Sequence, residues 1–191
     1  MTSMGGNPLL RVRNLVAGYD RPVVGPLSFS IERGEVLGLR GANGAGKSTL
    51  LNAIADGARC FGGQIERAPA LRLAYQAQHP VRHRGLPLTG RELLRIAGAE
   101  HRAVPASLAA TLEQRTDRLS GGQHQLLRVW AALAAGADLV LLDEPTNNLD
   151  PSHERLLADM LSTQARARAV LLVSHELGFI DAVCTRVLEL G

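Results

Sequence analysis

The sequence predicts an α/β fold: a mainly parallel sheet flanked by helices, with a small antiparallel β part and an inserted helical part. Two observations carry this prediction. A glycine-rich loop, residues 41–49, stands between an apolar strand and a helical stretch. A second apolar strand, Leu139-Val140-Leu141-Leu142, ends in Asp143 and Glu144. Buried parallel strands read as near-continuous apolar runs, and open α/β sheets bind ligands outside the carboxyl ends of their strands. We therefore expect the chemistry at that edge.

The glycine-rich loop has the pattern G-x-x-x-x-G-K-S and contains Lys47, the only lysine of a chain with 21 lysines and arginines. It follows a strand at 35–40 and precedes a helix at 49–55. Its glycines let backbone N–H groups turn toward an anion, and the helix N-terminus adds partial positive charge. Lys47 reaches between phosphate oxygens, and Ser48 offers a hydroxyl to Mg²⁺. The residues expected to bind the phosphates are Asn43, Gly44, Ala45, Gly46, Lys47, Ser48 and Thr49.

Asp143 and Glu144 follow the second strand. A carboxylate at this end of a strand faces the nucleotide crevice, so Asp143 is placed to hold Mg²⁺ through water. Glu144 faces the attacking water and is the candidate general base. Taken alone, the pair is equally consistent with a strand followed by a helix-capping acid, and the phosphate loop decides for the catalytic interpretation.

A second glycine motif, Leu119-Ser120-Gly121-Gly122-Gln123, precedes a helical stretch at 124–135. A serine before two glycines is typical of a helix cap, and the same N–H groups and hydroxyl can also hold a phosphate. One nucleotide does not need two phosphate cradles within one domain. We therefore expect Ser120, Gly121, Gly122 and Gln123 to serve the ATP of a neighbouring protomer.

These motifs together resemble the ATP-binding cassette (ABC) ATPases, over essentially the whole chain, and the string at 119–123 is that family's signature. The resemblance implies a P-loop NTPase core of the RecA-like type, with ATP and Mg²⁺ as cofactors. It assigns catalysis to Lys47, Gln78, Glu144 and His175, and Mg²⁺ to Ser48, Gln78 and Asp143. It also implies that Tyr19 stacks on adenine and that His175 contacts the γ-phosphate. Gln76 takes the place of Gln78 if the loop is shifted. Asp150 is expected to approach the phosphate site of the partner.

We expect residues 1–191 to form a single nucleotide-binding domain with three parts. Residues 9–34 and 61–75 give the antiparallel part, 35–60 and 136–191 the nucleotide core, and 79–135 a helical subdomain with short helices at 90–99 and 105–115. The chain departs from the family where an arginine usually stands near 126 or 131. It has Leu126 and Ala131 there, with Arg128 between them, and Trp130 in place of a small residue.

Other features point away from further sites. Net charge is +3, but the arginines are scattered without a run of five, so no nucleic-acid partner is expected. Cys60 and Cys184 match no metal spacing and are expected to be buried. His79, His83 and His101 also match no ligand motif and are expected on a solvated face. With no N-terminal apolar leader and no apolar run near ~18 residues, we expect membrane association only through a partner.

The resemblance leaves two functions open. The first is the ATP-hydrolysing subunit of an ABC transporter, a head-to-tail homodimer that drives a transmembrane permease. It would be a cytoplasmic protein, peripheral on the inner face of the cell membrane through the permease. A short match of residues 85–94 to bacterial zinc and manganese importers favours metal-ion uptake. We expect the permease to dock at residues 81–94, with Leu86 and Leu88 as apolar anchors. The alternative for these two leucines is ordinary loop packing.

The second function is that of an ABC protein acting on the ribosome or on another non-membrane partner. The stretches at 144–150 and 179–184 resemble that branch. Its members carry two cassettes joined by a long linker, whereas this chain has one phosphate loop. The transporter hypothesis is therefore favoured.

Overall fold

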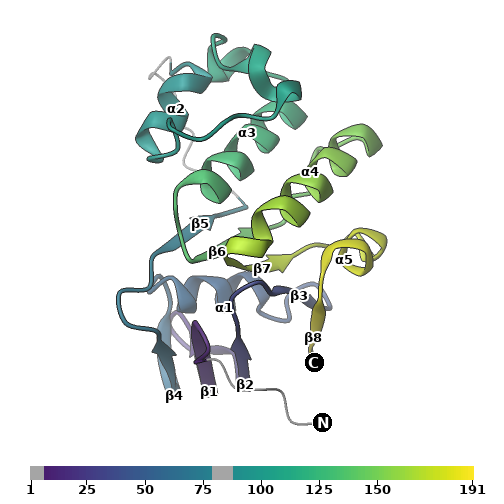
Figure 1. The fold of residues 1–191 in the computed structure, drawn as a ribbon. Helices are drawn as coiled ribbons and strands as arrows, with labels where there is room; N and C mark the ends of the chain where they lie inside the picture. Colours follow the sequence, from purple (N-terminus) through teal and green to yellow (C-terminus); the bar gives the residue numbers. More distant parts are fainter. Residues whose placement is uncertain (1–6, 79–87) are drawn as a thin grey trace.

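The computed structural model describes residues 7–78 and 88–191. These residues contain two β-sheets (Figure 1). The first is antiparallel, with the order β2-β1-β4. It consists of β1 (Leu10–Gly18), β2 (Pro22–Ile31) and β4 (Arg59–Arg67). The second is parallel, with the order β5-β6-β7-β3-β8. Its strands are β3 (Val36–Gly41), β5 (Leu73–Gln76), β6 (Leu139–Asp143), β7 (Ala169–Val173) and β8 (Arg186–Leu190). The predicted α/β fold is thereby confirmed.

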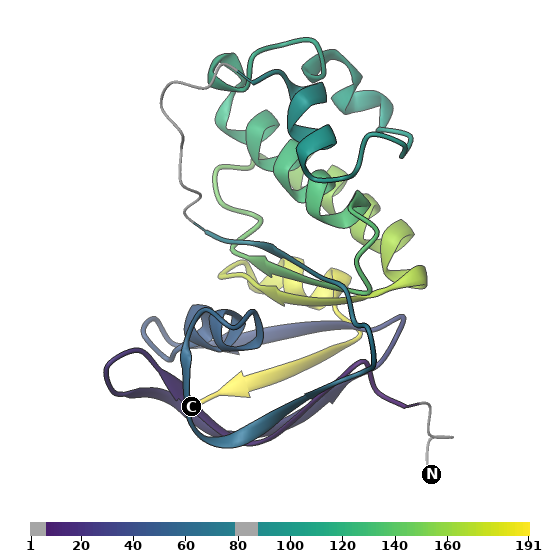
Figure 2. The same ribbon diagram turned by 90° about the vertical axis from the view of Figure 1, so that its left-hand side faces the viewer.

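The helices cover the parallel sheet on both faces. Helix α1 (Lys47–Ile54) lies between the two sheets, and α3 (Gly121–Ala134) and α4 (Pro151–Gln164) lie on the opposite face (Figures 1 and 2). The remaining helices are α2 (Gly90–Ile96), α5 (Leu177–Val183) and the 3₁₀ turns η1 (Ala106–Thr111), η2 (Thr116–Arg118) and η3 (Ala165–Ala167). Together with α3, the segments α2 and η1 form a helical part beyond the sheet, visible at the top of Figure 2.

Strand β6 shows why the parallel strands are apolar throughout. Successive side chains of a strand point to opposite faces. Val140 and Leu142 enter the cluster under α3 and α4, while Leu139 and Leu141 enter the cluster with α1 and the antiparallel sheet. All four are fully buried, and each leucine buried in this way contributes about 1.5–3 kcal/mol. The central strands are thus fixed from both sides, and their carboxyl ends form a rigid edge.

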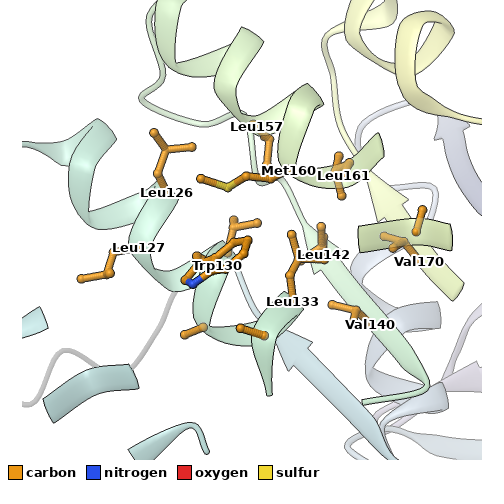
Figure 3. Close-up of a cluster of buried hydrophobic side chains, with 14 of the residues drawn as sticks. Leu126, Leu127, Trp130, Leu133, Val140, Leu142, Leu157, Met160, Leu161 and Val170 are labelled. Carbon is orange, nitrogen blue, oxygen red and sulfur yellow. The ribbon is translucent and has the colours of Figure 1, made fainter. Parts of the chain in front are cut away.

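Trp130 occupies the centre of the cluster under α3 and α4 (Figure 3). It is 5% exposed and lies near Leu126, Leu133 and Met160. Its indole Nε1 is buried without a hydrogen-bond partner among the described residues. The large ring is accommodated because α3 and α4 hold it between them and β6.

Some expectations differ from the structure. Residues 73–76 are not part of the antiparallel sheet predicted for 61–75: Leu73 lies opposite Leu139 in parallel pairing, because side chains on both faces of β5 are covered by the two clusters. The helix expected at 105–115 is the 3₁₀ turn η1, closed by the hydrogen bond from the Leu108 N–H to the Pro105 carbonyl. Cys60 is exposed rather than buried, because it lies on the uncovered face of β4, and Cys184 is half-buried.

Candidate active site

The phosphate loop, Asp143, Glu144 and His175 gather at the carboxyl ends of three adjacent strands, β6, β7 and β3. The phosphate loop follows β3, Asp143 closes β6 with Glu144 next to it, and His175 comes two residues after β7. In a parallel sheet these ends meet at one edge. The strand order therefore brings together residues that are more than 90 positions apart in the chain.

The phosphate loop has the backbone that an anion cradle needs. Gly46 has φ +88°, and a Cβ there would lie 2.7 Å from Val24 Cβ, so only glycine fits this turn. Lys47 is 7% exposed, and its Nζ donates to the carbonyls of Gly41 at 2.7 Å and Ala42 at 3.0 Å. The ammonium is thus held within the loop. Helix α1 begins at Lys47, which directs its N-terminal N–H groups to the same place.

Ser48 and Asp143 form the candidate magnesium site. Ser48 Oγ donates to Asp143 Oδ1 at 3.1 Å, and the Tyr75 hydroxyl lies 3.4 Å from Asp143 Oδ2. Hydroxyl and carboxylate oxygens are hard donors, so the pair fits Mg²⁺. The pKa of Tyr75 is raised, first by burial and then by the Asp143 charge, so the phenol keeps its proton and donates to the carboxylate. The sequence did not predict the role of Tyr75, because residues 61–75 were expected in the antiparallel sheet and not beside β6.

Glu144 is held rigidly beside His175. Its carboxylate is 3% exposed, its Oε1 lies 2.8 Å from His175 Nε2, and its Oε2 accepts from the His175 backbone N–H at 3.2 Å. The backbone of Glu144 has φ +52°, a left-handed conformation that costs a non-glycine residue about 1–3 kcal/mol. Burial raises the pKa of Glu144, against an opposing effect of His175. A buried carboxylate with a raised pKa is the arrangement of a general base.

A buried hydroxyl pair joins the segments that follow Glu144 and precede His175. Thr146 Oγ1 and Ser174 Oγ are 2.8 Å apart, and Ser174 Oγ also accepts from the Glu176 backbone N–H at 3.1 Å. Both hydroxyls are buried. Sequence reasoning assigned them no role, and no single motif predicts that they meet, because 28 residues separate them.

The signature residues form a second cluster at the start of α3. Ser120 and Gln123 make a reciprocal capping box, and Gly122 packs against His153 and Asn148. Asp150 caps α4 by accepting from the Ser152 and His153 backbone N–H groups. Within residues 7–78 and 88–191, no hydrogen bond links this cluster to Lys47 or Glu144.

The remaining candidates come from other segments of the chain. The Gln78 side chain is exposed, whereas Gln76 is buried, with its Nε2 donating to the Ala77 carbonyl at 3.0 Å and its Oε1 unpartnered among the described residues. Tyr19 is 51% exposed in the turn between β1 and β2. His101 is exposed as expected, while His79 and His83 lie outside the described residues.

Comparison with known proteins decides the family. Residues 24–147 match the family model described as ABC transporter. The chain belongs to the ABC transporter family. The resemblance seen in the sequence is thereby confirmed, and ATP is the nucleotide that this domain binds. The cassette is an ATPase subunit of a transporter, and the ribosomal alternative is not favoured.

Curated relatives and solved structures agree with this assignment. The chain is 32% identical to the zinc import ATP-binding protein ZnuC of Marinobacter nauticus, over 97% of this chain and 75% of that protein. It is 35% identical to the protein of the same name from Paracoccus denitrificans, over 91% of this chain and 72% of that one. A solved ATP-binding subunit of an ABC transporter superposes with a TM-score of 0.79 at 27% identity, over 95% of this chain and 85% of that one.

No helix within the described part of the chain is long and apolar enough to cross a bilayer. ATPase subunits of this family work with a transmembrane permease.

Proposed function

We propose that this cassette drives the uptake of a divalent metal ion, zinc, through a transmembrane permease. The proposal is supported by relatives named zinc import proteins, which match over most of both chains. The observation that carries the ATPase chemistry is the edge at which Ser48 meets Asp143 and Glu144 meets His175.

In the proposed mechanism the chain's own groups divide the work. Lys47 and the N–H groups of residues 43–49 bind the β- and γ-phosphates. Ser48, Asp143 and Gln78 would hold Mg²⁺, which would supply neutralising charge on the phosphates. Glu144 accepts a proton from water as the water oxygen bonds to the γ-phosphorus. The bond from that phosphorus to the bridging oxygen breaks, which yields ADP and phosphate. His175 holds Glu144 in line and contacts the γ-phosphate.

The proposed working unit is a head-to-tail homodimer. Ser120, Gly121, Gly122 and Gln123 of one protomer face the phosphate loop of the other, and Tyr19 stacks on the adenine of its own protomer. The absence of a hydrogen bond between the signature and the phosphate loop in the described part of one chain supports this arrangement. The exposed Asp150 is available near the shared interface. Each ATP would then be enclosed by two chains.

We further propose that the permease holds the cassette at the inner face of the cell membrane. The sequence places docking at 81–94, next to Gln78. Of its two named anchors, Leu86 lies outside the described residues and Leu88 is half-buried. The short helix α2 begins within this range, with a capping box between Thr89 and Glu92.

The test is growth and zinc uptake in a strain lacking this gene. Wild-type protein should restore radioactive zinc uptake under chelation, whereas Glu144→Gln should not. If the wild-type protein restored manganese uptake alone, manganese would replace zinc as the proposed substrate. If the deleted strain took up both metals at the normal rate, the transport proposal would be wrong. ATP-dependent co-sedimentation with ribosomes, without a bound permease, would revive the alternative.

A further inference from the structure

Arg128 and Gln125, one turn apart on α3, connect two segments of the active site. Arg128 Nη2 donates to the Ala77 carbonyl at 2.8 Å, and Arg128 Nη1 donates to Gln125 Oε1 at 3.3 Å. Gln125 Nε2 donates in turn to the Pro145 carbonyl at 3.2 Å and to the Glu144 carbonyl at 3.4 Å. These contacts run from the residue before Gln78 to the backbone of the candidate base.

The chemistry of the two side chains suits this task. A guanidinium presents its donors in a rigid fork, so Arg128 fixes the angle between the Ala77 carbonyl and the Gln125 amide as well as their separation. Gln125 is 8% exposed, and its amide donates to the Pro145 carbonyl and to the Glu144 carbonyl, which also accepts from the Asn147 backbone N–H. One end of this amide accepts and the other donates, so the orientation is set by both neighbours.

The position of the arginine follows from the packing of α3. Leu126 is fully buried in the cluster under α3 and α4, where a guanidinium would lose its hydration without a partner. Arg128 is on the half-buried side of the helix that faces Ala77. The chain therefore carries its arginine at the position from which the Gln78 segment is within reach.

The backbone conformation of Glu144 explains why contacts from Gln125 are needed. Glu144 holds its carboxylate on a left-handed backbone, which persists only where surrounding contacts fix it. The contacts from Gln125 reach the carbonyls of Glu144 and Pro145, immediately beside that strained unit. A shift of Ala77 would pull on Arg128 and then on the peptide that orients the base.

We propose that Arg128 and Gln125 are positioning residues for ATP hydrolysis, which couple the segment at Gln78 to the backbone of Glu144. The coupling rests on the proposed function, because it assigns Glu144 the role of base. Neither side chain is among the residues proposed to bind ATP. Both act through the peptide groups that they hold, and the signature at the start of the same helix moves with them.

The test compares Arg128→Met, Gln125→Leu and the double variant with wild type. Arg95→Met is the matched control, since Arg95 is an exposed arginine of α2. We expect kcat to fall about tenfold in each single variant, with KM for ATP within about twofold, because orientation and not binding is lost. The double variant should lose no more than the worse single variant, as members of one chain of contacts are not additive.

Hydrogen exchange without nucleotide gives a second readout that does not depend on turnover. In Arg128→Met, amide exchange should rise at Ala77 and Gln78 and also at Glu144 and Asn147, whose N–H groups donate to Val173 and Glu144. The coupling would be overturned if amide exchange rose only at residues 77–78. It would also be overturned if the losses of kcat were additive, or if kcat fell in proportion to the melting temperature of each variant. Turnover at the wild-type rate in Glu144→Gln would instead refute the proposed base, with the exchange result still deciding the coupling.

Discussion

Glu144 and His175 contact each other twice, through the ring at 2.8 Å and through the His175 backbone N–H at 3.2 Å. The two carboxylate oxygens are therefore used by one residue, which follows the neighbouring strand. A carboxylate held at both oxygens cannot rotate freely, so the proposed base is oriented before the attacking water is placed.

Glu144→Gln should retain ATP binding and lose turnover. The amide has the shape of the carboxylate but cannot accept a proton from water. We expect kcat to fall by at least about a hundredfold and an ATP-bound dimer to accumulate on size-exclusion chromatography. Phosphate release and binding of a fluorescent ATP analogue measure the two effects. Hydrolysis at the wild-type rate would show that another group takes the proton.

The pH dependence of turnover should show an acid limb set by Glu144. Because burial raises the pKa of Glu144 above its ordinary value of 4.5, the carboxyl becomes protonated at a higher pH than an exposed glutamate. A protonated carboxyl cannot act as the base, so kcat should decline as pH falls through the raised pKa. A rate that stays constant down to pH 4.5 in a folded protein would contradict this.

The same pKa shift predicts a stability difference. A carboxyl whose pKa is higher in the folded state stabilises the fold below its unfolded value, and this contribution is lost as pH rises through the folded value. Glu144→Gln should thus melt above wild type at pH 8, and the gap should close toward pH 4.5. Glu66→Gln, at an exposed position on β4, is the control for the removal of a carboxylate. Equal melting curves at pH 8 would count against the shift.

Lys47→Arg should weaken nucleotide binding although the charge is unchanged. The ammonium of Lys47 sits within the loop against the carbonyls of Gly41 and Ala42. A planar guanidinium is larger and directs its donors in a fixed plane. We expect at least about a tenfold rise in Kd for a fluorescent ATP analogue. Unchanged affinity would mean that any cation serves here.

Two inactive variants should complement each other if the site is shared. Lys47→Ala removes the phosphate contact, and Ser120→Arg blocks the signature. A mixed dimer keeps one intact site, so equal mixing should restore about a quarter of wild-type activity by random pairing of a two-fold dimer. Activity that stays at background over all mixing ratios, with both variants folded by circular dichroism, would place the signature and the phosphate loop in separate sites.

Features that depend on residues close together in the sequence were predicted better than contacts between distant residues. Strand β6 was predicted from its apolar run at Leu139–Leu142 and is observed as Leu139–Asp143, because an apolar run that ends in two acids leaves little choice. The helix predicted from His124 begins instead at Gly121, since the capping box of Ser120 sets its start. The contact of Arg128 with Ala77 spans 51 positions, and no local pattern specifies it. Propensity and motifs are local, whereas partners of long side chains depend on how the elements pack.

Trp130 is the only tryptophan of the chain and lies buried between α3, α4 and β6. The cassette consequently carries a built-in optical probe, without any label, in the helix that begins with the signature. Indole emission depends on the polarity around the ring, so the spectrum should move to longer wavelength if α3 draws away from the sheet and admits water. A stopped-flow recording of this emission after mixing with ATP can time the movement of the helical part before any phosphate is released.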